Sequence, residues 1–430
     1  MATFRSLLTV VALGTALLAV GCAHESPTAV LTTTAVAPSP EVDVTANVPS
    51  SVLHEQPTIT VTKGAAAVPD ELLVAVKPGT RVVLDATTGP KPVGEFDLNK
   101  HYQVVRVPAG MTRAQAIAEL QKHTNVLSVV PDRVYNAQLT PNDPSYGSEW
   151  GEKKINAQTA WDKHVDASGV TVAVLDTGVD YLHPELLGRV IKGPDLADGT
   201  SDPMDHMGHG THVAGIIGAA GNNGIGVAGV AWNCKILAIK VLGDDGNGTT
   251  DTVAQGIKYA ADHGARVINM SLGTSDQTID PVLHEAMDYA HQHGCVICAA
   301  SGNESGPVGA PANDPNALAV SSTSHFWLFE WCSLYSNTGP KVEVAAPGGG
   351  ILSTLPSEGS QLGRNYGTLS GTSMATPFVS GEAALIIAQH PSWSADQVRA
   401  RIDAAVDHKG SSGRNNDYGY GRVDLAKALD

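Results

Sequence analysis

Continuous apolar runs alternate with helix-like stretches over the larger, C-terminal part of this 430-residue chain. The runs over residues 170–175 and 295–300 are short and made of β-branched or small residues, which is typical of strands buried on both faces. Residues 213–218 and 374–388 instead carry small and apolar residues at helical spacing. This alternation predicts an α/β fold over residues 139–430, a doubly wound, mostly parallel sheet with helices on both faces.

A smaller α+β unit is predicted over residues 67–138, before the α/β part. Three strands are expected, over residues 71–76, 102–107 and 126–130. Residues 112–123 carry apolar residues at helical spacing, and Thr112 is the expected N-cap of that helix.

The first 22 residues predict an export signal. Arg5 precedes an apolar run over residues 7–20, which is too short and too interrupted by glycine for a membrane span. The run ends at Cys22 in a pattern that resembles a bacterial lipoprotein signal, in which Cys22 carries the lipid and is the only membrane contact. An ordinary secretory signal with an incidental cysteine is the alternative. Residues 23–66, rich in Thr, Pro and Ala, predict a disordered tether.

Three segments supply an acid, a base and a nucleophile in the order Asp, His, Ser. Asp176 follows a predicted strand at its carboxyl end, where catalytic groups collect in α/β sheets. His209 and His212 begin a predicted helix, and the absence of an accompanying H-E-x-x-H pattern disfavours zinc. Ser373 is expected near a helix N-terminus, where the positive end of the helix dipole would stabilise a developing oxyanion. Pro377 is expected in the first turn of that helix. Each residue alone could be an ordinary turn or cap residue.

Together these segments resemble the subtilisin-like serine proteases, the subtilases, over residues 140–430. The resemblance implies that His209 takes the proton of Ser373 and that Asp176 fixes the His209 tautomer. His212 is then a structural histidine. Asn303, which follows the 295–300 strand, matches the asparagine that holds the oxyanion in this family.

The same resemblance implies how substrates bind and how the enzyme matures. The edge segment Ser271, Leu272 and Gly273 would pair with an extended peptide, and Ala300 and Gly302 would be small walls of a pocket for large apolar side chains. The unit over residues 67–138 resembles an inhibitory prodomain. Ser373 is then expected to cut the chain within residues 136–140.

The start of the catalytic part resembles the thermitase branch of the family, which implies a calcium site. The matching positions are Asp143, Glu185, Gly221, Asn223, Ile225 and Val227, three of them through backbone carbonyls. Hard oxygen ligands in loops are what calcium requires. A second cation site is suggested by Asp195, Asp198 and Asp202, for which a solvated acidic loop is the alternative.

The net charge, the cysteines and an aromatic run bear on possible partners and disulfide bridges. The net charge of −16 argues against nucleic-acid binding. Cys295 and Cys298 should point to opposite faces of a strand as buried free thiols, whereas a bridge between Cys234 and Cys332 stays open. The aromatic run over residues 326–332 is a protein-contact patch, extra substrate surface or a packed loop.

These features predict a secreted, monomeric, calcium-dependent serine endopeptidase that is made as a zymogen and acts on proteins and peptides. Its own prodomain is the expected intramolecular inhibitor. An esterase or peptide ligase that uses the same acyl-enzyme is an alternative. A second alternative is a lipid-anchored binding protein on a subtilase scaffold, which predicts damaged catalytic residues.

Overall fold

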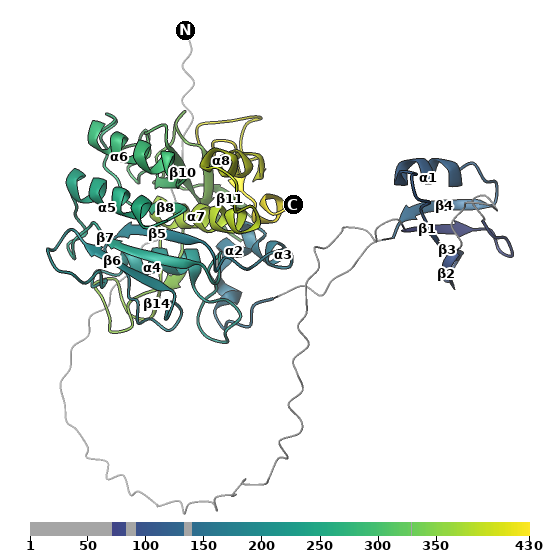
Figure 1. The fold of residues 1–430 in the computed structure, drawn as a ribbon, viewed down its shortest axis with the longest axis horizontal. Helices are drawn as coiled ribbons and strands as arrows, with labels where there is room; N and C mark the ends of the chain where they lie inside the picture. Colours follow the sequence, from purple (N-terminus) through teal and green to yellow (C-terminus); the bar gives the residue numbers. More distant parts are fainter. Residues whose placement is uncertain (1–70, 83–91, 133–139, 328) are drawn as a thin grey trace, which may run out of the picture. The chain divides into compact units, whose positions relative to one another are not determined.

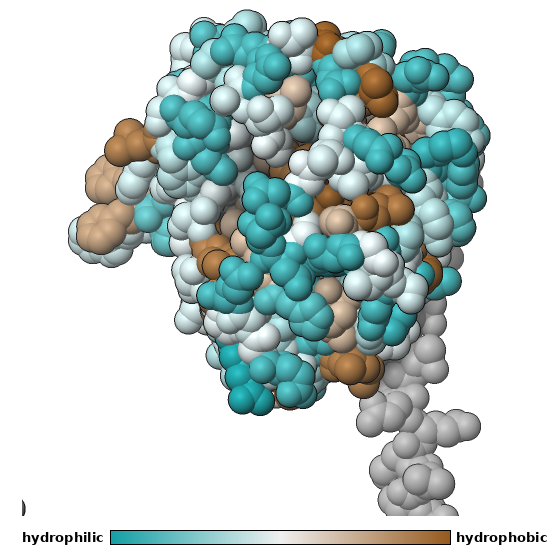
Figure 2. Space-filling view, turned by 90° about the vertical axis from the view of Figure 1, so that its left-hand side faces the viewer, coloured by the Kyte–Doolittle hydropathy of each residue, from teal (hydrophilic) through white to brown (hydrophobic). Residues whose placement is uncertain are grey.

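The computed structural model of the chain describes residues 71–82, 92–132, 140–327 and 329–430. The predicted export signal, the tether and the maturation segment up to residue 139 lie outside the described residues. None of the helices in the described part is long and apolar enough to cross a membrane. Figure 2 shows one face of the molecule, on which hydrophobic side chains form small patches separated by hydrophilic ones.

The predicted α+β unit contains a four-stranded antiparallel sheet in the order β2-β3-β1-β4. Its elements are β1 (Glu71–Val76), β2 (Pro92–Asp97), β3 (His101–Arg106), α1 (Arg113–Leu120) and β4 (Val126–Pro131). Thr112 caps α1 as predicted, because its hydroxyl accepts from the Gln115 N–H and the Gln115 side chain accepts from the Thr112 N–H. Strand β2 was not predicted, because Pro92, Gly94 and two acids interrupt its apolar pattern.

The larger part is built on a ten-stranded sheet, which confirms the predicted fold class (Figure 1). The strand order is β15-β16-β12-β10-β9-β8-β5-β7-β6, with β11 beside β10. The strands are β5 (Thr171–Asp176), β6 (Val190–Asp195), β7 (Lys235–Lys240), β8 (Val267–Met270), β9 (Val296–Ala300), β10 (Ala317–Phe326), β11 (Phe329–Cys332), β12 (Val344–Pro347), β15 (Val406–Asp407) and β16 (Arg422–Val423). The pairs are parallel except β10–β11 and β15–β16.

Helices cover both faces of this sheet (Figure 1). They are η1 (Tyr146–Ser148), α2 (Trp150–Lys154), α3 (Ala157–Trp161), α4 (His209–Gly218), α5 (Thr250–Asp262), α6 (Pro281–Gln292), α7 (Thr372–Gln389), α8 (Ala395–Ala404) and α9 (Leu425–Ala428). Successive side chains of β5 point to opposite faces of the sheet and so enter two different cores. Val172 and Val174 pack with α4 and α7. Ala173 and Leu175 pack with α5 and α6. A two-stranded sheet of β13 (Ile351–Thr354) and β14 (Tyr366–Leu369) lies against α4.

Helix α7 starts earlier than its proline suggested. The helix begins at Thr372, so Pro377 lies in the helix interior and not in the first turn. The prediction was wrong because Gly371 and Thr372 precede the apolar run and carry no helical signal of their own. Proline has no N–H to donate to the carbonyl four residues earlier, which here is that of Ser373.

The aromatic segment after residue 325 forms a hairpin, so a packed loop is the wrong alternative. Strands β10 and β11 pair antiparallel, with Phe326 opposite Phe329 and Ser324 opposite Trp331. Directly opposite residues share a face, and this face points outward. Phe326 is 73% exposed and Phe329 70%, and Trp327 at the turn is 80% exposed.

The other face of the hairpin packs onto the domain. His325 stacks on Trp150, with ring centroids 4.1 Å apart. Glu330, opposite His325, is nearly buried and lies within 3.9 Å of Lys154 and 3.6 Å of Arg422. The strand period therefore explains why the aromatic residues gather on the exposed face.

The cysteines of the described residues are free thiols, including Cys234 and Cys332, so the bridge left open by the sequence is not formed. Cys295 and Cys298 lie in the two different cores, as their spacing predicted. Burial raises the pKa of the Cys298 thiol to about 12, which keeps it protonated and unreactive.

Candidate active site

Asp176 and His209 are joined by a hydrogen bond of 2.7 Å between Oδ1 and Nδ1. Asp176 is the last residue of β5 and is fully buried, and His209 is the first residue of α4. A Cβ on Gly210 would collide with the carbonyl oxygen of Gly178. The glycine after His209 therefore lets the start of α4 approach the end of the strand closely enough for this hydrogen bond.

The pKa of His209 reflects a competition between burial and charge. Burial lowers this pKa, but the Asp176 carboxylate, by its charge and its hydrogen bond, raises it, and Asp205 adds to the rise. The net direction is upward from the ordinary value. The hydrogen bond to Asp176 occupies Nδ1, so Nε2 is the nitrogen that can exchange a proton with another group.

Asp205 is a buried residue of this site that was not predicted from the sequence. Its carboxylate accepts from the Gly208 N–H at 2.8 Å and from the Thr211 N–H at 2.8 Å, so it satisfies the open start of α4. It also accepts from the Thr177 hydroxyl at 2.9 Å. An acid shortly before a helix start is a capping signal that could have identified it.

His212 has a structural environment. Its Nε2 lies 3.1 Å from the Gly367 carbonyl of β14, and burial lowers its pKa to about 3, so it stays neutral. His209 and His212 thus have separate partners. In the described ranges, no group of three or more His, Cys, Asp or Glu is arranged to hold a metal ion.

Ser373 is the second residue of α7, at the end of the helix where backbone N–H groups lack helical partners. Its hydroxyl donates to the Ser271 carbonyl at 3.1 Å, and the Ser271 hydroxyl donates to the Ser373 carbonyl at 2.8 Å. Among the hydrogen bonds of the described residues, none joins His209 directly to Ser373. Such contacts are often long in the absence of substrate.

Asn303 follows β9 and lies beside the start of α7. Its side-chain oxygen accepts from the Thr372 N–H at 2.8 Å and from the Thr372 hydroxyl at 3.0 Å. These two bonds define the orientation of the amide, so its NH₂ group is the donor that remains for a ligand. Thr372 is a further residue of the site that was not predicted from the sequence.

A cavity of 190 Å³ adjoins Ser373 and Asn303. Its lining includes the predicted substrate residues Leu272, Gly273, Ala300 and Gly302. Glu304 also lines it and was not predicted; its carboxylate accepts from the Asn303 N–H at 3.0 Å and from the Asn337 amide at 2.7 Å.

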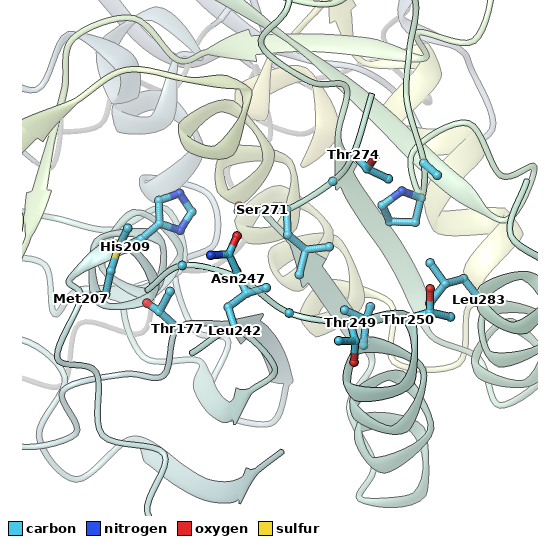
Figure 3. Close-up of a pocket in the computed structure, with 17 residues that line it drawn as sticks. Thr177, Met207, His209, Leu242, Asn247, Thr249, Thr250, Ser271, Thr274 and Leu283 are labelled. Atoms are coloured by element: carbon cyan, nitrogen blue, oxygen red, sulfur yellow. The ribbon is translucent and has the colours of Figure 1, made fainter. Parts of the chain in front are cut away.

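A groove of 390 Å³ continues from this site along the surface. Figure 3 shows it running from His209 past Ser271 toward Thr274 and Leu283. Ser271 is therefore shared by the groove and by the hydrogen bonds to Ser373. A groove lined by the segment Ser271 to Gly273 is where an extended peptide could pair with the main chain.

The predicted first calcium ligands gather around the loop that follows α4. Asp143 accepts from the N–H groups of Asn222 at 2.6 Å and Asn223 at 3.2 Å. Glu185 accepts from the Val227 N–H at 3.0 Å and from the Asn223 side chain at 2.8 Å. Both acids are buried, and burial, with Asp143 adding its charge, raises the pKa of Glu185.

The predicted second cation site is not assembled. Asp195 accepts from N–H groups of its own turn, Asp198 lies 3.2 Å from the Lys240 ammonium, and Asp202 lies 3.5 Å from that of Lys192. The acids are thus already matched by lysines and backbone donors, which favours the alternative of a solvated acidic loop. The sequence did not indicate this because Lys240 is distant from the acids along the chain.

A buried acid bonded to an imidazole at the start of α4, with a serine at the N-terminus of the neighbouring helix α7, is the arrangement of a serine hydrolase. The comparisons with known proteins define the family further. The subtilase family model matches residues 167–421. Thermitase from Thermoactinomyces vulgaris is 44% identical over 292 residues, which cover 67% of this chain and 99% of thermitase.

Two further proteases are also similar to this chain. The thermophilic serine proteinase of Bacillus sp. (strain AK1) is 42% identical over 301 residues, which cover 70% of this chain and 71% of that protein. Among solved structures, a protease from Pseudoalteromonas arctica PAMC 21717 matches with a TM-score of 0.60 and 33% identity, over 68% of this chain and 99% of that one. The chain belongs to the subtilase family and is a serine endopeptidase, so the binding-protein alternative is wrong.

Proposed function

We propose that this endopeptidase cleaves peptide bonds with Asp176, His209 and Ser373 as its catalytic triad and Asn303 as an oxyanion donor. The observation that carries the proposal is the 2.7 Å hydrogen bond between the buried Asp176 and His209 Nδ1. It holds the tautomer in which Nε2 can accept a proton, and Asp176 stabilises the imidazolium that results.

The reaction proceeds in two acyl transfers. The Ser373 hydroxyl turns from the Ser271 carbonyl, gives its proton to His209 Nε2, and its oxygen attacks the scissile carbonyl carbon. The oxyanion accepts from the Ser373 N–H and the Asn303 amide. Protonated His209 then gives its proton to the leaving amine, which leaves an acyl-enzyme. Water, deprotonated by His209, releases the acid and restores Ser373.

The substrate is an extended stretch of a protein or peptide. The segment Ser271 to Gly273 offers main-chain donors and acceptors at the groove, as a sheet edge does for an added strand. The small walls at Ala300 and Gly302 leave the 190 Å³ cavity open to a large apolar side chain before the scissile bond.

The enzyme is made as an exported zymogen. The α+β unit that precedes the catalytic part is the inhibitory prodomain, and Ser373 releases it by a cut within residues 136–140. Support comes from the order of the segments: an apolar N-terminal run, a polar stretch, a small α+β unit and then the catalytic part. A lipid on Cys22 would lie on the prodomain side of the cut, so processing would free the mature enzyme.

One calcium ion stabilises the folded enzyme at the loop after α4. The residue types fit this ion, because the buried carboxylates of Asp143 and Glu185 both contact the loop after α4, and carboxylate, side-chain amide and backbone carbonyl oxygens are the ligands that calcium takes. Burial is the main cause that raises the pKa of Glu185, and the charge of Asp143 adds to the rise, so a cation bound near the two acids would favour their ionised forms. The predicted loop ligands are Gly221, Asn223, Ile225 and Val227.

A fluorophosphonate probe tests the function, because it labels only an activated serine. The wild-type protein should be labelled at Ser373, and Ser373→Ala should be unlabelled and should remain full length in a host without other proteases. Ser321→Ala, at a buried serine of β10, is the matched control and should be labelled and processed. If the mature wild-type protein takes up no label, the triad is refuted. Hydrolysis with excess amine present separates a protease from a ligase, since a ligase would give mainly the aminolysis product.

A further inference from the structure

The carbonyl group of the proposed nucleophile has an unusual hydrogen-bond donor. Within α7, the carbonyl of Ser373 would normally accept from the N–H of residue 377, but Pro377 has none. The Ser271 hydroxyl occupies this position and donates to the Ser373 carbonyl at 2.8 Å. The Ser373 carbonyl is thus bonded to the substrate segment, because its usual donor in the helix is missing.

Two further buried side chains continue this connection. The Asn269 amide donates to the Ser271 hydroxyl oxygen at 3.0 Å, and the Ser380 hydroxyl donates to the Asn269 side-chain oxygen at 2.8 Å. Asn269 and Ser380 are fully buried, and Ser271 is 3% exposed. The chain of hydrogen bonds runs from the middle of α7, across β8, and back to the start of α7.

The direction of each hydrogen bond follows from the one before it. Ser380 donates to the Asn269 oxygen, so the Asn269 NH₂ group must face Ser271. Because the Ser271 oxygen then accepts from Asn269, its single proton is directed to the Ser373 carbonyl. In a buried environment such a chain resists rearrangement, since any break leaves a polar group unpaired.

We propose that Asn269 is a positioning residue for the reaction of Ser373, acting through Ser271. It touches neither substrate nor the reacting atoms. Asn269 orients the Ser271 hydroxyl, and this hydroxyl fixes the position of the Ser373 backbone relative to the segment that binds the peptide. The N–H of Ser373 is an oxyanion donor, so its position matters for the reaction. This inference rests on the proposed function, in which Ser373 is the nucleophile.

The expected effect of losing Asn269 is on kcat, because the contact between the Ser373 N–H and the oxyanion forms only in the transition state. The oxyanion exists only in the transition state, so a displaced Ser373 backbone lowers kcat and leaves peptide binding along the groove nearly unchanged. Small displacements of reacting groups reduce rates by roughly ten- to a hundredfold. A purely structural Asn269 would lower the melting temperature without this selective loss of kcat.

A double-mutant cycle tests the proposal. Asn269→Ala, Ser271→Ala and the double variant are compared by kcat and KM on one peptide substrate, per active site titrated with a fluorophosphonate. We expect each single variant to lose roughly tenfold in kcat with KM within about twofold. The double variant should lose no more than Ser271→Ala alone, because Asn269 acts only through Ser271. Asn269→Leu, which keeps the branched shape and the number of side-chain heavy atoms, replaces Asn269→Ala if the latter does not fold.

Ser321→Ala is the matched control for stability. Ser321 is fully buried in β10, and its hydroxyl donates to the Asp417 carbonyl at 2.7 Å, apart from the Ser380–Asn269–Ser271 chain. It should lower the melting temperature as Asn269→Ala does, with kcat unchanged. The inference is overturned, and the proposed function is not, if the losses in kcat of the two single variants multiply in the double variant. The same holds if Asn269→Ala lowers the melting temperature and leaves kcat unchanged. A wild-type protein that the titrant does not label overturns the proposed function, and the inference with it.

Discussion

Thr372 donates both its N–H and its hydroxyl to the side-chain oxygen of Asn303, at 2.8 and 3.0 Å. One residue of α7 therefore determines which end of the Asn303 amide faces the nucleophile. The carbonyl end is occupied, and the NH₂ end is presented to the cavity beside Ser373.

Asn303→Ala should lower kcat by roughly a hundredfold or more with little change in KM, because the lost donor acts on the oxyanion. The scale of this expectation is that of the equivalent loss in a subtilisin. Steady-state kinetics on a peptide substrate measure both constants. Thr372→Val, which removes one of the two orienting bonds, should give a smaller loss in kcat. A rise in KM alone would count against an oxyanion role.

The acidic limb of the pH–rate profile should lie above the ordinary histidine pKa of 6.5, because the pKa of His209 is raised. His209 must be neutral to accept the Ser373 proton, so activity falls as the pH drops through this pKa. Asp176→Asn removes the charge that raises the pKa, so the limb should move to lower pH while kcat falls on the order of 10⁴-fold. Measurements of kcat/KM across pH test this, and an unmoved limb would contradict the pairing.

Removal of calcium should lower the melting temperature of the fluorophosphonate-inhibited enzyme, which does not digest itself. A ligand present at a hundred times its dissociation constant stabilises the native state by about 2.7 kcal/mol. Asp143→Asn should weaken this response to calcium. Asp202→Asn, at an exposed carboxylate that pairs with Lys192, is the control and should respond like the wild type. A melting temperature that ignores chelator at every calcium concentration excludes the site.

Glu382 should make the folded state less stable as the pH rises. It is fully buried in α7, and within the described residues neither carboxylate oxygen has a hydrogen-bond partner. Burial raises its pKa well above 4.5, Asp424 raises it further, and Arg401 opposes them. The folded state thus keeps a proton that the unfolded state releases. Stability from this group is complete below the unfolded pKa and is lost as the pH rises toward the folded pKa.

Glu382→Gln carries no titrating proton at this position. Its stability relative to the parent should therefore increase with pH, by up to about 1.4 kcal/mol per pH unit. Urea unfolding of the inhibited enzymes at about pH 5, 7 and 9 measures the difference, with Asp202→Asn again as the exposed control. A difference that stays constant across these pH values would show that Glu382 does not titrate on unfolding.

The sequence by itself determined the features that depend on neighbours along the chain. Apolar periodicity was enough to predict the α/β sheet, the residue type of Thr112 to predict the cap, and the spacing of Cys295 and Cys298 to predict their opposite faces, because these signals are local. The order of the segments around Asp176, His209 and Ser373 was enough to predict the family. Strand β2 was not predicted, because proline, glycine and acidic residues interrupt its apolar pattern.

Only the tertiary structure decided which distant groups meet. It paired Asp198 with Lys240 and Asp202 with Lys192, and so favoured a solvated acidic loop over a second cation site. It placed the Ser271 hydroxyl at the carbonyl that Pro377 leaves without a donor. The physical reason is common to these cases: a buried polar group must find a partner, and the packing of strands and helices determines which partner is within reach.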